Sequence, residues 1–80
     1  MRKIETFYTG GGITLAEVDI SPDQYAVVST EAPDFMAVYR YDDGEKTYLP
    51  EDMVASTQHH DLTPELKAIY KEMLEKLKKH

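Results

Sequence analysis

Short turn sequences, repeated along the first half of the chain, constrain its fold more than any other feature. They read "GGG" at 10–12, "SPD" at 21–23, "EAPD" at 31–34 and "DDG" at 42–44. Glycine supplies positive φ angles, proline fixes φ, and serine or aspartate side chains bond the local backbone. Links this short can join only antiparallel neighbours, because a parallel crossover needs about a dozen residues or more. The sequence therefore predicts an antiparallel meander in chain order.

The segments between these turns have the composition of strands. "QYAVVST" is rich in β-branched residues, which favour strands. "FMAVYRY" alternates, so that Phe35, Ala37, Tyr39 and Tyr41 share one face, opposite Met36, Val38 and Arg40. We expect strands over 3–8, 13–20, 24–30 and 35–41, and a shorter fifth strand over 46–49.

The C-terminal segment has the pattern of an amphipathic helix. Thr63 is suited to cap its start and Pro64 to occupy its first position. Apolar residues then recur at helical spacing in one stripe: Leu66, Ile69, Tyr70, Met73, Leu74 and Leu77. Such a helix would cover one face of the sheet.

The predicted fold class is therefore α+β: a four- to five-stranded antiparallel β-meander packed by one C-terminal α-helix. Residues 1–80 are expected to form a single domain, because a chain of 80 residues is too short for two cores. Within it we expect the meander over 1–49, a connecting turn or linker over 50–62, and the helix over 63–79. Pro50 favours a single helical turn at the start of that connection.

Composition indicates a cytoplasmic globular protein. Hydrophobic residues make up 41% and charged residues 30% of the chain, which is ordinary for a soluble domain. No apolar stretch approaches the ~18 residues of a membrane span, and no signal-peptide pattern is visible. The absence of cysteine excludes disulfides and thiolate chemistry.

The net charge of −6 is unevenly distributed. Residues 1–61 carry twelve acidic and four basic side chains, a net charge of −8, whereas residues 62–80 carry a net charge of +2. A body this acidic repels phosphate backbones over most of its surface. We therefore expect no nucleic-acid partner.

The glycines at 10–12 do not have the context of a phosphate-binding loop. Such a loop runs directly into a helix and usually carries a lysine. Here the glycines are followed by "ITLAEVDI", which alternates at strand period. A hairpin turn is the expected structure.

The carboxylates that neighbouring strands could bring together are Glu5, Glu17 and Asp19. Glu17 and Asp19 alternate with apolar residues, a pattern typical of a solvated strand face. A general acid needs a shielded carboxyl, and an open meander offers little shielding. No serine lies in a nucleophile elbow. We expect no catalytic residues and no enzymatic activity.

His59, His60 and Asp61 have donor atoms that suit a metal ion. Adjacent residues rarely point the same way, however, and the sequence has no second ligand cluster with metal-site spacing. We expect no evolved metal site here, only adventitious binding, and no cofactor.

Six tyrosines, with no tryptophan, are the one unusual feature of the composition. Tyrosine offers a rigid, amphipathic contact surface at low entropic cost. The expected binding residues are those that the strands can bring to one face: Tyr25, Tyr39, Tyr41 and Tyr48.

The sequence thus predicts a small non-enzymatic protein-interaction or regulatory domain. Its partner would be another protein or a second copy in a homodimer, with no nucleic acid and no membrane involved. Two alternatives remain open: an acidic inhibitor that mimics DNA in a nucleic-acid enzyme, and a domain that binds a small ligand.

Overall fold

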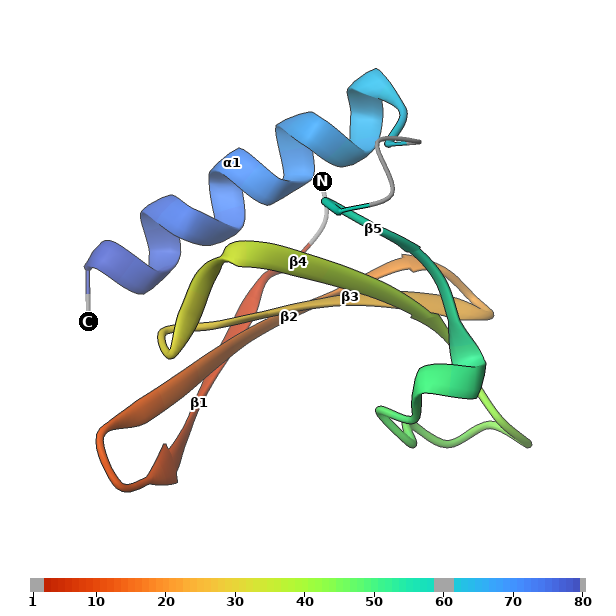
Figure 1. Ribbon diagram of the computed structural model, residues 1–80, viewed down its shortest axis with the longest axis horizontal. Coiled ribbons are helices and arrows are strands. Elements are labelled where there is room, and N and C mark those ends of the chain that lie inside the picture. Colours follow the sequence, from red (N-terminus) through yellow and green to blue (C-terminus); the bar gives the residue numbers. More distant parts are fainter. Residues whose placement is uncertain (1–2, 59–61, 80) are drawn as a thin grey trace.

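A computed structural model describes residues 3–58 and 62–79 and confirms the predicted α+β fold (Figure 1). Its sheet has five antiparallel strands in the order β1-β2-β3-β4-β5, so that neighbours in the sheet are neighbours in the chain. The strands are β1 (Glu5–Gly10), β2 (Ile13–Ser21), β3 (Gln24–Ser29), β4 (Ala32–Arg40) and β5 (Met53–Ser56), followed by helix α1 (Pro64–Lys78).

The glycine run turns the corner between β1 and β2, as the sequence predicted. Gly10, Gly11 and Gly12 have φ angles of 91°, 62° and 82°. This left-handed region is one that residues with a Cβ rarely adopt. The register shifts between Tyr8 and Gly10, so the hairpin also contains an irregularity.

The prediction of a strand over 46–49 is wrong. The expected two-residue turn does form at Asp43 and Gly44, where φ is 53° and 79°. Asp42 and Glu45 exchange backbone hydrogen bonds of 2.9 and 3.0 Å across it. Beyond that bridge the chain leaves the sheet.

Residues 41–52 instead form a connection that we call the 41–52 loop. Tyr48 within it has a φ of 58°, which is incompatible with an extended strand. The loop ends in a 3₁₀ turn at Pro50–Asp52, where the sequence predicted a single helical turn. The fifth strand then follows as β5, within the stretch 50–62 expected to be a connection, and it pairs with β4.

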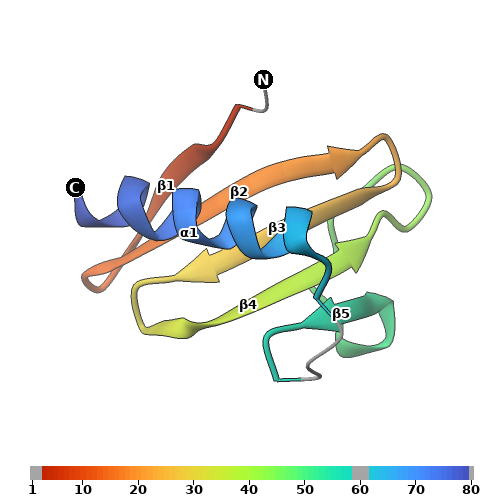
Figure 2. The same ribbon diagram turned by 90° about the horizontal axis from the view of Figure 1, so that it is seen from above.

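Helix α1 packs its apolar stripe on one face of the sheet (Figure 2). Ile69, Met73 and Leu77 are buried at a spacing of one helical turn. Beneath them lie short or β-branched side chains and one methionine: Ala16, Val18, Ala26, Val28, Met36 and Val38. The small alanines allow the helix to approach the sheet closely, so this face is the core.

Two hydrogen bonds fix the helix at its start and against β4. The Thr63 hydroxyl accepts the Leu66 N–H at 3.2 Å, which confirms the predicted cap. The Tyr70 hydroxyl donates to the Pro33 carbonyl at 2.6 Å. Among residues 3–58 and 62–79, no helix has the length and apolar character needed to cross a membrane.

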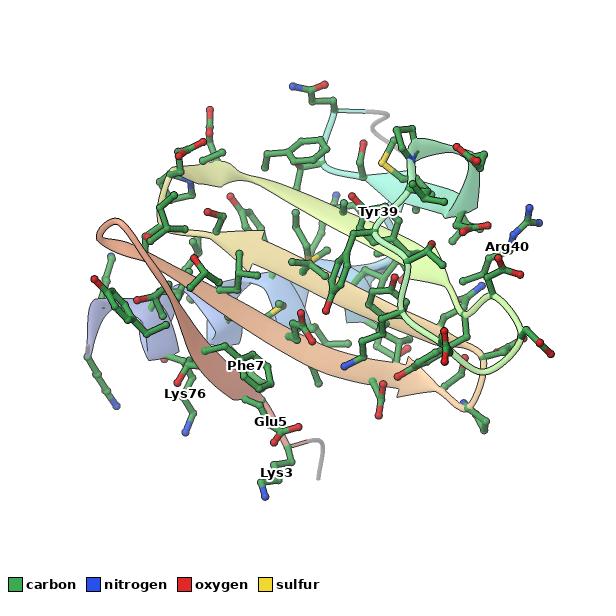
Figure 3. The ribbon with its side chains drawn as sticks, turned by 90° about the horizontal axis from the view of Figure 1, so that it is seen from below. Lys3, Glu5, Phe7, Tyr39, Arg40 and Lys76 are labelled. Carbon is green, nitrogen blue, oxygen red and sulfur yellow. The ribbon has the colours of Figure 1, made fainter. Side chains whose placement is uncertain are left out.

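The opposite face of the sheet has no helix over it, and we call it the open face. In Figure 1 the β1–β2 hairpin and the 41–52 loop both extend below the sheet, away from α1. Figure 3 looks onto this face, with the helix behind the strands. The open face therefore lies between two projecting segments of the chain.

Candidate functional site

Strand register brings the predicted carboxylates and tyrosines to the open face. Glu5 pairs with Glu17, and Asp19 pairs with Tyr25. Tyr25 in turn pairs with Tyr39 on β4. Because side chains alternate along a strand, these five lie on the face opposite the core residues Ala16, Val18 and Val38.

The four tyrosines expected to form a binding face come together in one cluster, centred on Tyr25. The ring centroid of Tyr25 lies 5.5 Å from that of Tyr39, 4.9 Å from that of Tyr41 and 5.7 Å from that of Tyr48. The Tyr39 pair is stacked and the Tyr48 pair is edge-on, which are favourable geometries for aromatic rings.

Only the outer members of this tyrosine cluster are accessible. Tyr25 is fully buried, whereas Tyr48 is 44% exposed. Tyr39 and Tyr41 are half-buried. Tyr25 therefore supports the cluster from beneath, and the other three present its surface.

Glu17 is buried, and the prediction that it lies on a solvated face is wrong. Only 4% of it is exposed. Its carboxylate accepts a hydrogen bond from Lys46 Nζ at 2.9 Å and another from the Tyr48 hydroxyl at 2.5 Å. The reason is the 41–52 loop, which folds back over this end of the sheet and shields a side chain that the strand pattern alone would leave in water.

These contacts shift the pKa values of both loop residues. Burial acts to lower the pKa of Lys46, but the hydrogen bond to Glu17 and its negative charge outweigh burial and raise the pKa above its ordinary value. Burial, and then the hydrogen bond to Glu17, raise the pKa of Tyr48 well above its ordinary value. Lys46 is therefore cationic and Tyr48 neutral at physiological pH.

Two further bonds hold the middle and the start of the loop. The Tyr48 backbone N–H donates to the Tyr25 hydroxyl at 3.1 Å, and the Tyr41 hydroxyl bonds the Asp19 carboxylate. Burial, followed by that bond to Asp19, raises the pKa of Tyr41.

Asp52 anchors the far end of the loop. It accepts from the Thr47 hydroxyl at 2.5 Å and from Arg40 Nε at 3.3 Å. The Thr47 bond, and then the Arg40 contact, lower the pKa of Asp52. The three carboxylates under and beside the loop thus each have a bonded partner.

Beside the tyrosine cluster the open face contains an apolar pocket of about 160 Å³, which we call the open-face pocket. It lies on β3 and β4, and it is lined by Val27, Ser29, Ala32, Phe35, Ala37 and Tyr39. Three of these side chains are short, so the larger ones form walls around a depression. Phe7, 43% exposed on β1, adds apolar surface to the same face (Figure 3).

Sequence reasoning found the tyrosines but missed the pocket and the Glu17 contacts. Ala37, a short residue between Phe35 and Tyr39 on one strand face, was the available signal for the pocket. No comparable signal existed for Glu17, because its partners lie 29 and 31 residues away in a loop.

The expected adventitious metal ligands His59, His60 and Asp61 lie outside the described residues. Within residues 3–58 and 62–79, no three histidine, cysteine, aspartate or glutamate side chains are grouped so as to hold a metal ion. Comparison of the chain with protein-family models, curated proteins and solved structures finds no match.

Proposed function

We propose that this chain is a small non-enzymatic protein-interaction domain that binds its partner through the open face of the sheet. The open-face pocket carries the proposal. It is an apolar depression of about 160 Å³ with half-buried aromatic walls, and the exposed ring of Tyr48 lies 6.3 Å from that of its lining residue Tyr39. Pockets that accept an aromatic or aliphatic anchor are typical centres of protein interfaces.

The ionisable groups beside the pocket support binding in preference to catalysis. The Glu17 carboxylate is occupied by Lys46 and Tyr48. Raised pKa values keep Lys46 protonated and Tyr48 neutral, so neither is prepared to act as a base or nucleophile near neutral pH. Their geometry is that of groups that hold a loop in place.

Capture from a lysate of the source organism tests the proposal, with wild type compared with Ala32→Leu. Ala32 lines the pocket and is half-buried, so leucine should fill the depression. Ala68→Leu makes the same change at an exposed position on α1 and is the matched control. We expect mass spectrometry to find a protein that wild type and Ala68→Leu retain and Ala32→Leu loses.

Equal capture of all proteins by the three forms would contradict binding through the open face. Circular dichroism of each variant must show an unchanged fold. A small molecule found in the wild-type protein, with no captured protein, would instead favour the ligand-binding alternative.

A further inference from the structure

We infer that the open-face pocket accepts a basic protein segment in which cationic side chains flank one apolar side chain of about phenyl size. The inference rests on the proposed function and adds the chemistry of the partner. It combines the volume of the pocket with the charge on the open side of the sheet.

The volume sets the size of the anchor. A cavity of ~150 Å³ lined by apolar side chains accommodates a benzene-sized group. The open-face pocket has about 160 Å³ and a mainly apolar lining. A single phenylalanine or leucine side chain therefore fits it.

The charge on the open side of the sheet sets the chemistry of the flanking residues. Exposed carboxylates, which we call the rim carboxylates, lie on the strands and the β3–β4 turn of the open side or on the 41–52 loop: Glu5, Asp19, Glu31, Asp42, Asp43 and Glu45. Glu31 directly precedes the pocket residue Ala32, and the last three form the tip of the 41–52 loop.

Few cations oppose the rim carboxylates. Residues 3–58 contain eleven acidic side chains and three basic ones, a net charge of −8. Lys46 is bonded to Glu17 and Arg40 to Asp52. The third, Lys3, lies beside Glu5 at the edge of the sheet (Figure 3).

The remaining described cations belong to the helix layer. Residues 62–79 carry five lysines and three glutamates, a net charge of +2. In Figure 3, Lys76 projects from the helix behind the sheet. The described sheet layer is therefore acidic, with the rim carboxylates on or beside its open face, and the helix layer is mildly basic.

This charge distribution distinguishes the possible occupants of the pocket. Packing the open faces of two copies together would bring two acidic surfaces into contact, which is unfavourable. A nucleic acid would be repelled for the same reason. A segment with lysines or arginines on either side of its apolar anchor is attracted by the rim carboxylates while the anchor fills the pocket.

Fluorescence anisotropy with synthetic peptides tests the inference. The probe is a labelled peptide with one phenylalanine between pairs of lysines. One control peptide has serine in place of phenylalanine, and another has glutamates in place of the lysines. We expect the probe to bind wild type at least about tenfold more tightly than either control.

The pocket and the charge make separate contributions in this experiment. Ala32→Leu should weaken binding of the probe peptide by about tenfold or more, whereas Ala68→Leu should leave its affinity unchanged. Raising the salt concentration from about 0.05 to about 0.5 M should weaken it by about tenfold, because exposed charges are screened. The peptide and salt comparisons use wild type alone, so they remain decisive even where a variant fails to fold.

Equal binding of the lysine and glutamate peptides, or no binding of any peptide to wild type, would overturn the inference. If a protein is still captured from the lysate by wild type and not by Ala32→Leu, the proposed interaction function stands. Only the proposed basic chemistry of the partner is then wrong. If binding is seen only between copies of this chain, the occupant is a second copy and the inference is wrong.

Discussion

At the scale of single residues, the buried carboxylate of Glu17 links the sheet to the 41–52 loop. We predict that Glu17→Gln lowers the free energy of unfolding by about 2 kcal/mol, because it removes a charge-assisted bond to Lys46 and weakens the bond to Tyr48. Urea denaturation measures the change. Glu5→Gln on the adjacent strand is the matched control, since Glu5 is exposed, and it should change the value by less than about 0.5 kcal/mol. Equal effects of the two substitutions would contradict a bonding role for Glu17.

Gly44 shows how backbone conformation alone can require a residue type. Its φ is 79°, and a Cβ built there would meet nothing within 4 Å. We predict that Gly44→Ala costs about 1 kcal/mol of unfolding free energy, because an L-residue is strained in the left-handed region. Gly44→Asn should cost less, since asparagine tolerates this region better. If urea denaturation shows that alanine and asparagine are equally costly, conformational strain is not the cause.

At the scale of elements, the 41–52 loop should be the part of the fold most sensitive to alkali. The folded-state pKa values of Lys46 and Tyr48 lie above their ordinary values of 10.5 and 10.0. Protonation of both groups therefore stabilises the fold fully below the ordinary values, and this stability is lost as the pH rises through the folded-state values.

We predict an unfolding free energy that is nearly constant from about pH 7 to about pH 9.5 and falls above about pH 10. Denaturant titrations at each pH, with tyrosinate absorbance as a second signal, measure it. The Tyr48→Phe variant has no ionisable group at that position, so it should lose less unfolding free energy above about pH 10. Tyr8→Phe, at an exposed tyrosine outside the cluster, is the control and should leave the loss unchanged. Identical alkaline profiles for the two variants would contradict the account of Tyr48.

Elements governed by local sequence were predictable, and those governed by distant contacts were not. The spacing from Leu66 to Leu77, with the cap at Thr63, specified α1, and the short turns specified the meander. The segment at 46–49 has strand-like composition, but the positive φ of Tyr48 and its bonds to Glu17 and Tyr25 hold it out of the sheet.

In the candidate site, too, features set by local sequence were predictable and features set by distant contacts were not. Alternation along β4 placed Tyr39 on one face correctly, and the cross-strand register then brought Tyr25 beside it. The burial of Glu17 depends on how the 41–52 loop folds, which no local pattern encodes, and the shape of the open-face pocket depends on how side chains of β3 and β4 pack across the strands. Contacts between side chains that are far apart in the chain could not be predicted from the sequence.

At the scale of the whole molecule, the two layers differ in both chemistry and charge. The helix buries one face of the sheet and carries a net charge of +2 over residues 62–79, whereas residues 3–58 carry −8. The apolar surface left on the open face thus belongs to the acidic layer, and the exposed Glu31 directly precedes the pocket residue Ala32. This difference in charge is the basis of the proposal that a basic partner binds the open face.

In-cell photocrosslinking is the most direct test that the open face is the binding face. Phe7 and Tyr8 are adjacent on β1 and exposed at 43% and 72%, yet they point to opposite faces of the sheet. Each would be replaced in turn by p-benzoylphenylalanine, and cells of the source organism would be irradiated. We predict a crosslinked adduct with another protein from position 7 and little or none from position 8. Adducts from position 8 alone, or equally from both positions, would contradict the assignment of the open face as the binding surface.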